Sequence, residues 1–90
     1  MVYPKKVSKL KLTKGKKKIT INISKVSGAK KYEIYRSTKK SKGYKKIKTI
    51  SSRKYINKNL KSKKVYYYKV RAINGSYKGS FSNVYKIKTK

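Results

Sequence analysis

The sequence predicts an all-β sandwich of seven short strands. Apolar and polar residues alternate in several segments, which is the period of a strand with one buried face. These segments are rich in Ile, Val, Tyr and Thr, and turn signals separate them about every ten residues. No segment has the spacing of an amphipathic helix. The expected strands cover residues 6–12, 17–24, 31–37, 44–50, 54–57, 65–73 and 82–89.

The first three strands are defined by alternation and by the turns between them. Lys9-Leu10-Lys11-Leu12 alternates, and Lys14-Gly15-Lys16 is the turn signal that follows it. Ile19-Thr20-Ile21-Asn22-Ile23-Ser24 continues the same period as far as Ser27-Gly28-Ala29. Tyr32-Glu33-Ile34-Tyr35 then forms the third strand, with Tyr32 and Ile34 on its inner face.

The other strands follow in the same way. The segment 44–50 is short and rich in Ile and Lys, and Asn57-Lys58-Asn59 ends the strand after it. Residues 66–72 give the clearest alternation, and Asn74-Gly75-Ser76 is a hairpin signal. Residues 85–89 form the last strand.

The alternation also predicts one core and therefore one domain, spanning residues 1–90. Ninety residues suit a single core, because independent domains usually need roughly 50 to 200 residues. Without cysteine, no disulfide can add stability. The expected inward residues are Leu10, Leu12, Ile19, Ile21, Ile23, Tyr32, Ile34, Ile47, Ile50, Leu60, Tyr66, Tyr68, Val70, Ala72 and Ile87.

One run and the spacing after it are specific to a known family. Residues 26–37 read VSGAKKYEIYRS, and they are followed in order by Tyr44-Lys45-Lys46-Ile47, Tyr55, Leu60 and residues 66–72. From about Pro4 to Thr89, the chain resembles bacterial fibronectin type III domains. The resemblance implies a seven-stranded immunoglobulin-like β-sandwich.

The resemblance has two further implications for the core. Leu60, six residues before Tyr66, implies a tyrosine corner, in which the phenol hydroxyl bonds to nearby backbone. Ile23 stands where such domains usually carry a core tryptophan, so other packing, such as that of the tyrosines, must compensate.

The resemblance also bears on location. Such domains are commonly spacers or interaction modules of secreted or surface proteins, which implies an extracellular or cell-surface setting. The start, Met1 to Lys5, has no apolar region of a signal peptide, and no run of 18 apolar residues could span a membrane.

The chain is exceptionally lysine-rich and basic. It has 30 lysines and arginines against one acidic residue, Glu33, giving a formal net charge of +29. A codon bias towards A and T explains abundant Lys, Ile, Asn and Tyr, but it does not exclude acidic residues. Two origins stay open: a natural basic domain and a deliberately supercharged variant of one. Either would attract polyanions such as nucleic acid, heparin-like or teichoic polymers.

The residue inventory argues against an enzyme. Without His, Cys or Asp, the chain has no carboxylate pair, histidine base or thiol nucleophile. It also lacks the ligands of an ordinary zinc or calcium site, so we expect no metal, cofactor or small-molecule substrate.

Candidate binding residues lie on the predicted outer face of the sheet. Alternation places Tyr35, Tyr67, Lys69 and Arg71 there together, and rings interleaved with cations are typical of single-stranded nucleic-acid and sugar-binding faces. The alternative is that tyrosine merely fills a strand, where it is favoured. Tyr77, in the loop after residue 74, is a further candidate, although a hairpin explains this loop equally well.

Glu33 is expected to face solvent from the same strand, neutralised across the sheet by Lys69 or Arg71.

Two functions remain open at this stage. The first is a non-catalytic, monomeric scaffold or interaction module whose charge binds polyanions without selectivity. The alternative is an evolved binder of teichoic acid, glycosaminoglycan or nucleic acid. Lysine pairs are spread over the whole chain, including Lys5-Lys6, which favours the first. A localised patch of rings and cations would favour the second.

Overall fold

The structure of the protein is a computed structural model that describes residues 6–90. Pro4 and Lys5 lie outside the described residues. The same holds for the expectation that Met1 to Lys5 have no signal-peptide region. The strands are β1 (Leu10–Gly15), β2 (Lys18–Ile23), β3 (Lys31–Ser37), β4 (Lys45–Ile50), β5 (Lys54–Asn57), β6 (Val65–Asn74), β7 (Tyr77–Lys78) and β8 (Tyr85–Lys88).

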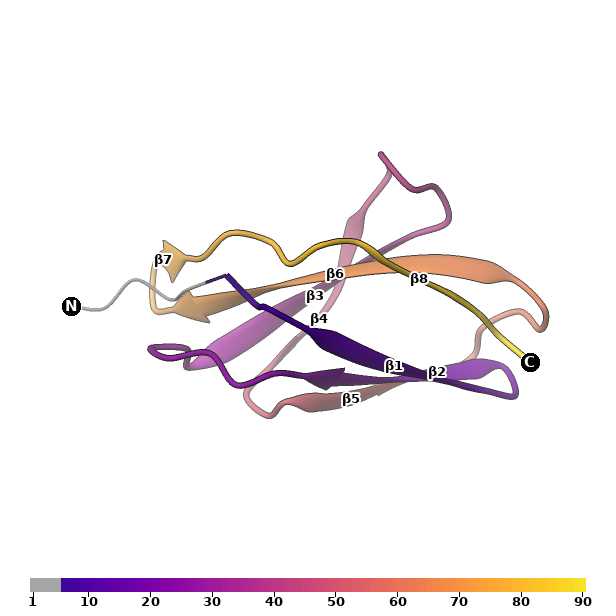
Figure 1. Ribbon diagram of the computed structural model, residues 1–90, viewed down its shortest axis with the longest axis horizontal. Coiled ribbons are helices and arrows are strands. Elements are labelled where there is room, and N and C mark those ends of the chain that lie inside the picture. The colour runs from indigo at the N-terminus through magenta and orange to yellow at the C-terminus, as the bar shows by residue number, and fades with distance from the viewer. Residues whose placement is uncertain (1–5) are drawn as a thin grey trace.

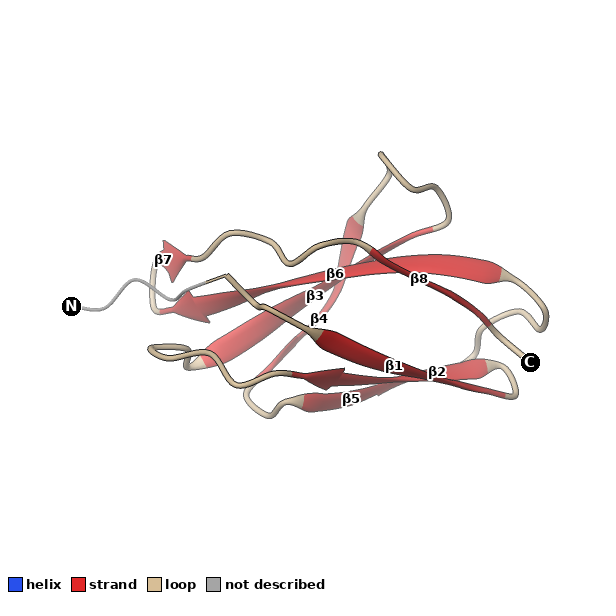
Figure 2. Ribbon diagram, in the orientation of Figure 1, coloured by secondary structure: helices blue, strands red, loops and turns tan. Residues whose placement is uncertain are grey.

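Two antiparallel sheets face each other. One contains three strands in the order β1-β2-β5, and the other contains five, in the order β4-β3-β6-β7 with β8 also paired to β6. Figure 2 shows two layers of strands joined by loops, with no helix in the part of the chain described. Accordingly, residues 6–90 contain no helix of the length and apolarity that a membrane crossing needs.

The core lies between the sheets, as the alternation predicts. Ile19, Ile21, Ile34, Tyr68 and Val70 are fully buried. Every residue expected to point inward is either buried or packed against the buried cluster. Val7 and Val26 also belong to that cluster, although neither lies in a strand.

Two of the seven predicted strands have the bounds that the structure gives. The predicted ranges 31–37 and 54–57 are confirmed, as β3 and β5. The predicted 6–12 is wrong at both ends, because β1 begins at Leu10 and continues to Gly15, which pairs with Lys18. The turn therefore falls at Lys16 and Lys17, one residue later than predicted, and Lys17 adopts a φ of 57° there.

An eighth strand was not predicted. β7 is two residues long and pairs with the end of β6, Asn74 opposite Tyr77. Gly75 makes the turn between them with a φ of 63°, a left-handed conformation that glycine adopts without steric cost. The hairpin expected from Asn74-Gly75-Ser76 is thus confirmed, and it forms a short extra strand.

The tyrosine corner is confirmed. The backbone N–H of Lys61 donates to the Tyr66 hydroxyl at 3.1 Å, and both Leu60 and Tyr66 are buried. This bond fixes the segment that crosses from the three-stranded sheet to β6, so it sets the position of the strand that carries Tyr67, Lys69 and Arg71.

Candidate interaction surface

The outer face of the five-stranded sheet brings together four residues predicted from the sequence to share it. In the β3–β6 pair, Tyr35 is opposite Lys69 and Glu33 is opposite Arg71. Because Tyr32 and Ile34 are buried inside, alternation turns these four side chains to the other face.

Rings and cations alternate on this face in a row that we call the aromatic–cation ladder: Tyr44, Lys69, Phe81, Arg71 and Tyr35. The Lys69 ammonium nitrogen lies 4.5 Å from the Tyr44 ring centroid and 4.2 Å from that of Phe81. The Arg71 guanidinium carbon lies 4.7 Å from the Phe81 centroid and 5.5 Å from that of Tyr35. The Tyr35 and Phe81 rings also meet edge to face, with centroids 4.9 Å apart. The cations of the ladder are thus already engaged by its rings.

Glu33 corrects one expectation. It is 4% exposed and does not face solvent. Arg71 donates from Nε to Glu33 Oε1 at 2.6 Å, and Lys46 Nζ lies 3.5 Å from Oε2. Of the two partners expected, Arg71 is right, whereas Lys69 contacts the rings instead. The Arg71 side chain is itself only 20% exposed, so it helps to cover the carboxylate.

The charge of Glu33 is stabilised in this position. Burial opposes its ionisation, but the hydrogen bond and charge of Arg71, with Lys46 and Lys78, outweigh burial and hold the pKa of Glu33 below its ordinary 4.5. The same pair raises the pKa of Arg71, although burial alone would lower it. Glu33 therefore anchors Arg71, and through it the Tyr35 hydroxyl, to which Arg71 Nη2 donates at 3.1 Å.

Tyr67 lies beside the ladder and lines a hollow of its own. The hollow has a volume of about 260 Å³ and is lined by Lys40, Tyr67, Val84 and Lys86. Lys86 is the β8 residue opposite Tyr67. Burial, and secondarily the charge of Tyr67, raise the pKa of the Tyr44 hydroxyl.

Tyr77 is the candidate that stands apart. It lies in β7, which Figure 1 shows at one end of the five-stranded sheet. Tyr77 is paired with Asn74 at the end of β6, and it is not among the residues that line the Tyr67 hollow.

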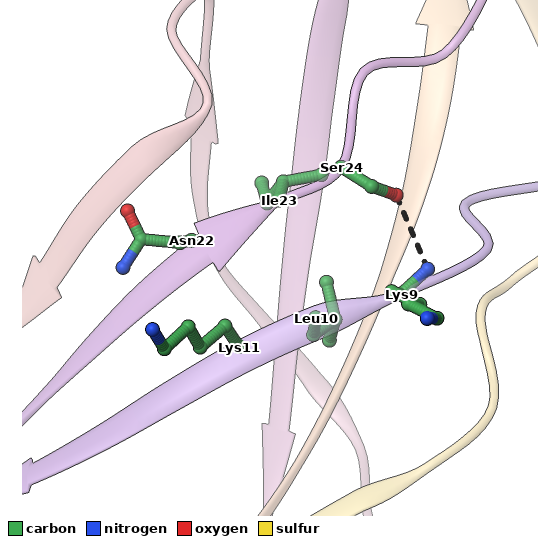
Figure 3. A pocket seen from close by; sticks show the side chains of 6 residues that line it. All are labelled: Lys9, Leu10, Lys11, Asn22, Ile23 and Ser24. Atoms are coloured by element: carbon green, nitrogen blue, oxygen red, sulfur yellow. Dashed lines mark hydrogen bonds between the residues drawn. The ribbon is translucent and has the colours of Figure 1, made fainter.

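The three-stranded sheet carries a different hollow, of about 260 Å³ (Figure 3). Lys11 and Asn22 lie on one side of Leu10 and Ile23, and Lys9 and Ser24 lie on the other. The Ser24 hydroxyl oxygen accepts a hydrogen bond from the Lys9 N–H at 3.1 Å. Ile23, which stands where such domains usually carry a tryptophan, lines this hollow. The residues that line the hollow with it include no tyrosine.

Two ladder residues, Tyr44 and Phe81, were not predicted. Phe81 lies outside any strand, so alternation gives no information about the direction of its side chain. Tyr44 falls within the predicted strand 44–50 but lies one residue before β4, and it was not singled out as a binding residue. Phe81 is the only phenylalanine of the chain and stands in a polar segment, which is the one sequence signal that could have drawn attention to it.

Residues 6–90 contain no group of three or more His, Cys, Asp or Glu side chains that could hold a metal ion.

Two facing antiparallel sheets, a tyrosine corner and a core of alternating residues define an immunoglobulin-like β-sandwich. Several solved structures share this arrangement. FN3tt is 25% identical over 100% of this chain and 98% of its own, with a TM-score of 0.87. The fibronectin type III domain of human fibronectin type III domain containing protein 3 is 24% identical over 99% and 88%, with a TM-score of 0.85. An Fn3-like protein from Clostridium thermocellum is 22% identical over 99% and 93%, with a TM-score of 0.78.

The chain has the fold of a fibronectin type III domain. No protein-family model matches its sequence, and neither does a curated protein sequence. Domains of this class are scaffolds and interaction modules and are generally not catalytic.

Proposed function

We propose that this domain is an interaction module that binds anionic polymers through the positive charge spread over its whole surface. One observation carries the proposal. The single acidic residue of the chain, Glu33, is buried and paired with Arg71, so the exposed side chains carry only positive charge.

The density of this charge is high enough for neighbouring charges to act together. The accessible surface of 6039 Å² and the net charge of +29 correspond to about 210 Å² for each unit of charge. That area implies a mean spacing of about 14 Å, comparable with the Debye length of about 8 to 10 Å at physiological ionic strength. A polyanion that docks here releases condensed counterions at each contact, which drives binding at low salt.

The ladder favours adhesion by charge over a stacking site for bases or sugars. Its ring faces already contact Lys69 and Arg71, and Arg71 is further committed to Glu33. A base that stacked on Phe81 would have to displace a cation from the ring. We therefore infer that Tyr35, Lys69 and Arg71 mainly order the sheet face and present its charge.

The Tyr67 hollow supports a second candidate, a binder that selects one polymer. Here a ring lies beside Lys40 and Lys86, which could contact a sugar or base and its anionic group together. Among the candidate residues on the sheet, Tyr67 lines a hollow in the described part of the chain.

The salt dependence of binding distinguishes the two. We expect heparin and single-stranded DNA to bind with similar micromolar affinity at about 50 mM salt. With six to eight contacts, the affinity should fall by about 10³ between 50 and 200 mM salt. Absence of binding at 50 mM salt would refute the proposal, and a preference for one polymer that persists above about 300 mM salt would favour the second candidate.

Charge-matched variants provide the control. Removing Lys40 and Lys86 should weaken heparin binding no more than removing Lys16 and Lys25, which are exposed elsewhere. A clearly larger loss with the first pair would show that the Tyr67 hollow is a selective site.

A further inference from the structure

A second cationic hollow lies at the other edge of the five-stranded sheet. It has a volume of about 320 Å³, and its lining includes Arg36, Ser37, Gly43, Lys45, Lys46 and Ile47. These residues come from the ends of β3 and β4 and from the loop that joins them. Three of them are cations: Arg36 and Lys45 are partners across the two strands, whereas the Lys46 ammonium lies 3.5 Å from Glu33.

Arg36 is held in a fixed orientation beside this hollow. Its Nη1 donates to Asn57 Oδ1 at 3.1 Å, and its guanidinium carbon lies 5.4 Å from the Tyr66 ring centroid. Asn57 is buried and also accepts a bond from the Tyr68 hydroxyl at 2.7 Å. The bond to Asn57 uses one of the five N–H donors of the guanidinium. Arg36 therefore has less conformational freedom to lose when it binds a ligand than a free surface arginine.

The strand register places like charges opposite each other here. Arg36 is the direct partner of Lys45, and Tyr35 is the partner of Lys46. The register shifts between Ile34 and Tyr35, so β4 has a bulge before this pair. Like charges that face each other across two strands are destabilising.

No acidic side chain is left to offset this cost. Glu33 is the only one in the chain, and it is committed to Arg71 at 2.6 Å and to Lys46 at 3.5 Å. A bound anion would supply the charge that Arg36 and Lys45 lack.

The loop that walls the hollow is ordered by its own hydrogen bonds. The Ser37 hydroxyl donates to the Lys42 carbonyl at 2.6 Å and accepts from the Lys39 N–H at 2.9 Å. Gly43 adopts a φ of +78°, and a Cβ there would lie 3.4 Å from Ser37 Oγ. The loop therefore has a defined shape against which a small ligand can fit.

We propose that this hollow binds a tetrahedral oxyanion of the phosphate or sulfate type, with Arg36 as the planar donor and Lys45 as a point charge. A guanidinium matches two oxygens of such a group, and two cations suit a multiply charged oxyanion better than a single carboxylate. This inference rests on the proposed function and deepens it, because it selects polymers that carry phosphate or sulfate groups.

The test is a titration of the full chain with inorganic phosphate at about pH 7, followed through backbone amide NMR shifts. Sodium chloride of equal ionic strength serves as the reference. We expect saturable shifts confined to residues 36–46. Arg36→Lys keeps the charge but loses the planar donor, so it should weaken phosphate binding by about tenfold, the value of one charge-assisted hydrogen bond. Lys45→Ser should weaken binding at least as much, whereas the control Lys25→Ser should change it less than about twofold.

The outcomes separate this site from the general proposal. Linear shifts spread over the whole chain, or wild-type affinity in both Arg36→Lys and Lys45→Ser, would overturn the site even if heparin still bound. Saturable phosphate binding in a protein that fails to bind heparin at about 50 mM salt would refute the general proposal and leave the site standing. Because Lys45 is exposed, Lys45→Ser should stay folded, and it should raise the melting temperature in phosphate-free buffer by removing the charge opposite Arg36.

Discussion

Replacing Glu33 by glutamine removes the only acidic side chain and leaves Arg71 without its charged partner. Exposed ion pairs contribute under about 1 kcal/mol, and breaking a fully buried pair costs about 3 to 5 kcal/mol. Glu33 is 4% exposed and the Arg71 side chain is 20% exposed, so this pair lies between those limits. We expect a loss of about 2 kcal/mol at pH 7, close to the value of one charged hydrogen bond. For a domain of this size, that corresponds to about 8 to 16 °C in melting temperature.

The same carboxylate should control the acid stability of the domain. The chain has no histidine and no other acidic side chain, so Glu33 is the only side chain that titrates in acid. Its pKa is lower in the folded state, so the unfolded state takes up the proton first as pH falls. The stability that ionised Glu33 contributes should therefore be fully present above about pH 5. It should be lost as the pH falls from the ordinary pKa of 4.5 through the lower pKa of the folded state.

Urea melts of the wild type and Glu33→Gln between about pH 7 and pH 2 test this reasoning. The two proteins should differ at neutral pH and converge in acid, because protonation of Glu33 mimics the substitution. A matched control is Lys46→Gln, whose side chain is 49% exposed and should contribute less than about 0.5 kcal/mol. If the wild type and Glu33→Gln lost the same free energy of unfolding in acid, titration of Glu33 would not be the cause of the acid sensitivity.

Four further changes test the core, the charge and the ladder. Tyr66→Phe should lower the free energy of unfolding by about 1 kcal/mol, because it removes the corner hydrogen bond. Leu60→Ala should lower it by about 2 to 4 kcal/mol, because it truncates a buried side chain. If urea melts show no change in either variant, the tyrosine corner does not stabilise the fold. Raising sodium chloride from about 20 to 500 mM shortens the Debye length from about 20 to 4 Å and should raise the melting temperature, whereas a flat response would exclude self-repulsion as a limit on stability. Phe81→Leu should cost about 1 to 2 kcal/mol and speed amide exchange in residues 79–84, and unchanged exchange would show that the ring does not hold this segment.

The fold could be predicted because the alternation of apolar and polar residues marks the strands and the spacing of Leu60 and Tyr66 marks the tyrosine corner. Ile19, Ile21, Ile34 and Val70 are buried at the positions that a period of two assigns, and the six-residue spacing of Leu60 and Tyr66 locates the corner. What alternation could not supply is structure outside the strands. Val7 is buried without belonging to a strand, so its burial reflects packing alone.

The candidate surface was predicted less completely. Tyr35, Lys69 and Arg71 share a face because strand geometry places them there. Phe81 reaches the same face from an irregular segment, which no periodic rule could indicate. The burial of Glu33 also depends on which long side chains fold over it, since a strand position that faces outward can still be covered by a neighbouring arginine.

The edge strand β4 has a consequence for assembly. It ends the order of its sheet, and it carries Lys45, Lys46 and Lys48 among its six residues. Two copies that met along this edge would bring six ammonium groups together, so crowded domains are protected from the edge-to-edge pairing that starts aggregation. A long polyanion would cancel that repulsion. Partial neutralisation should therefore cause clustering of the domain, and an excess of polymer should disperse it again.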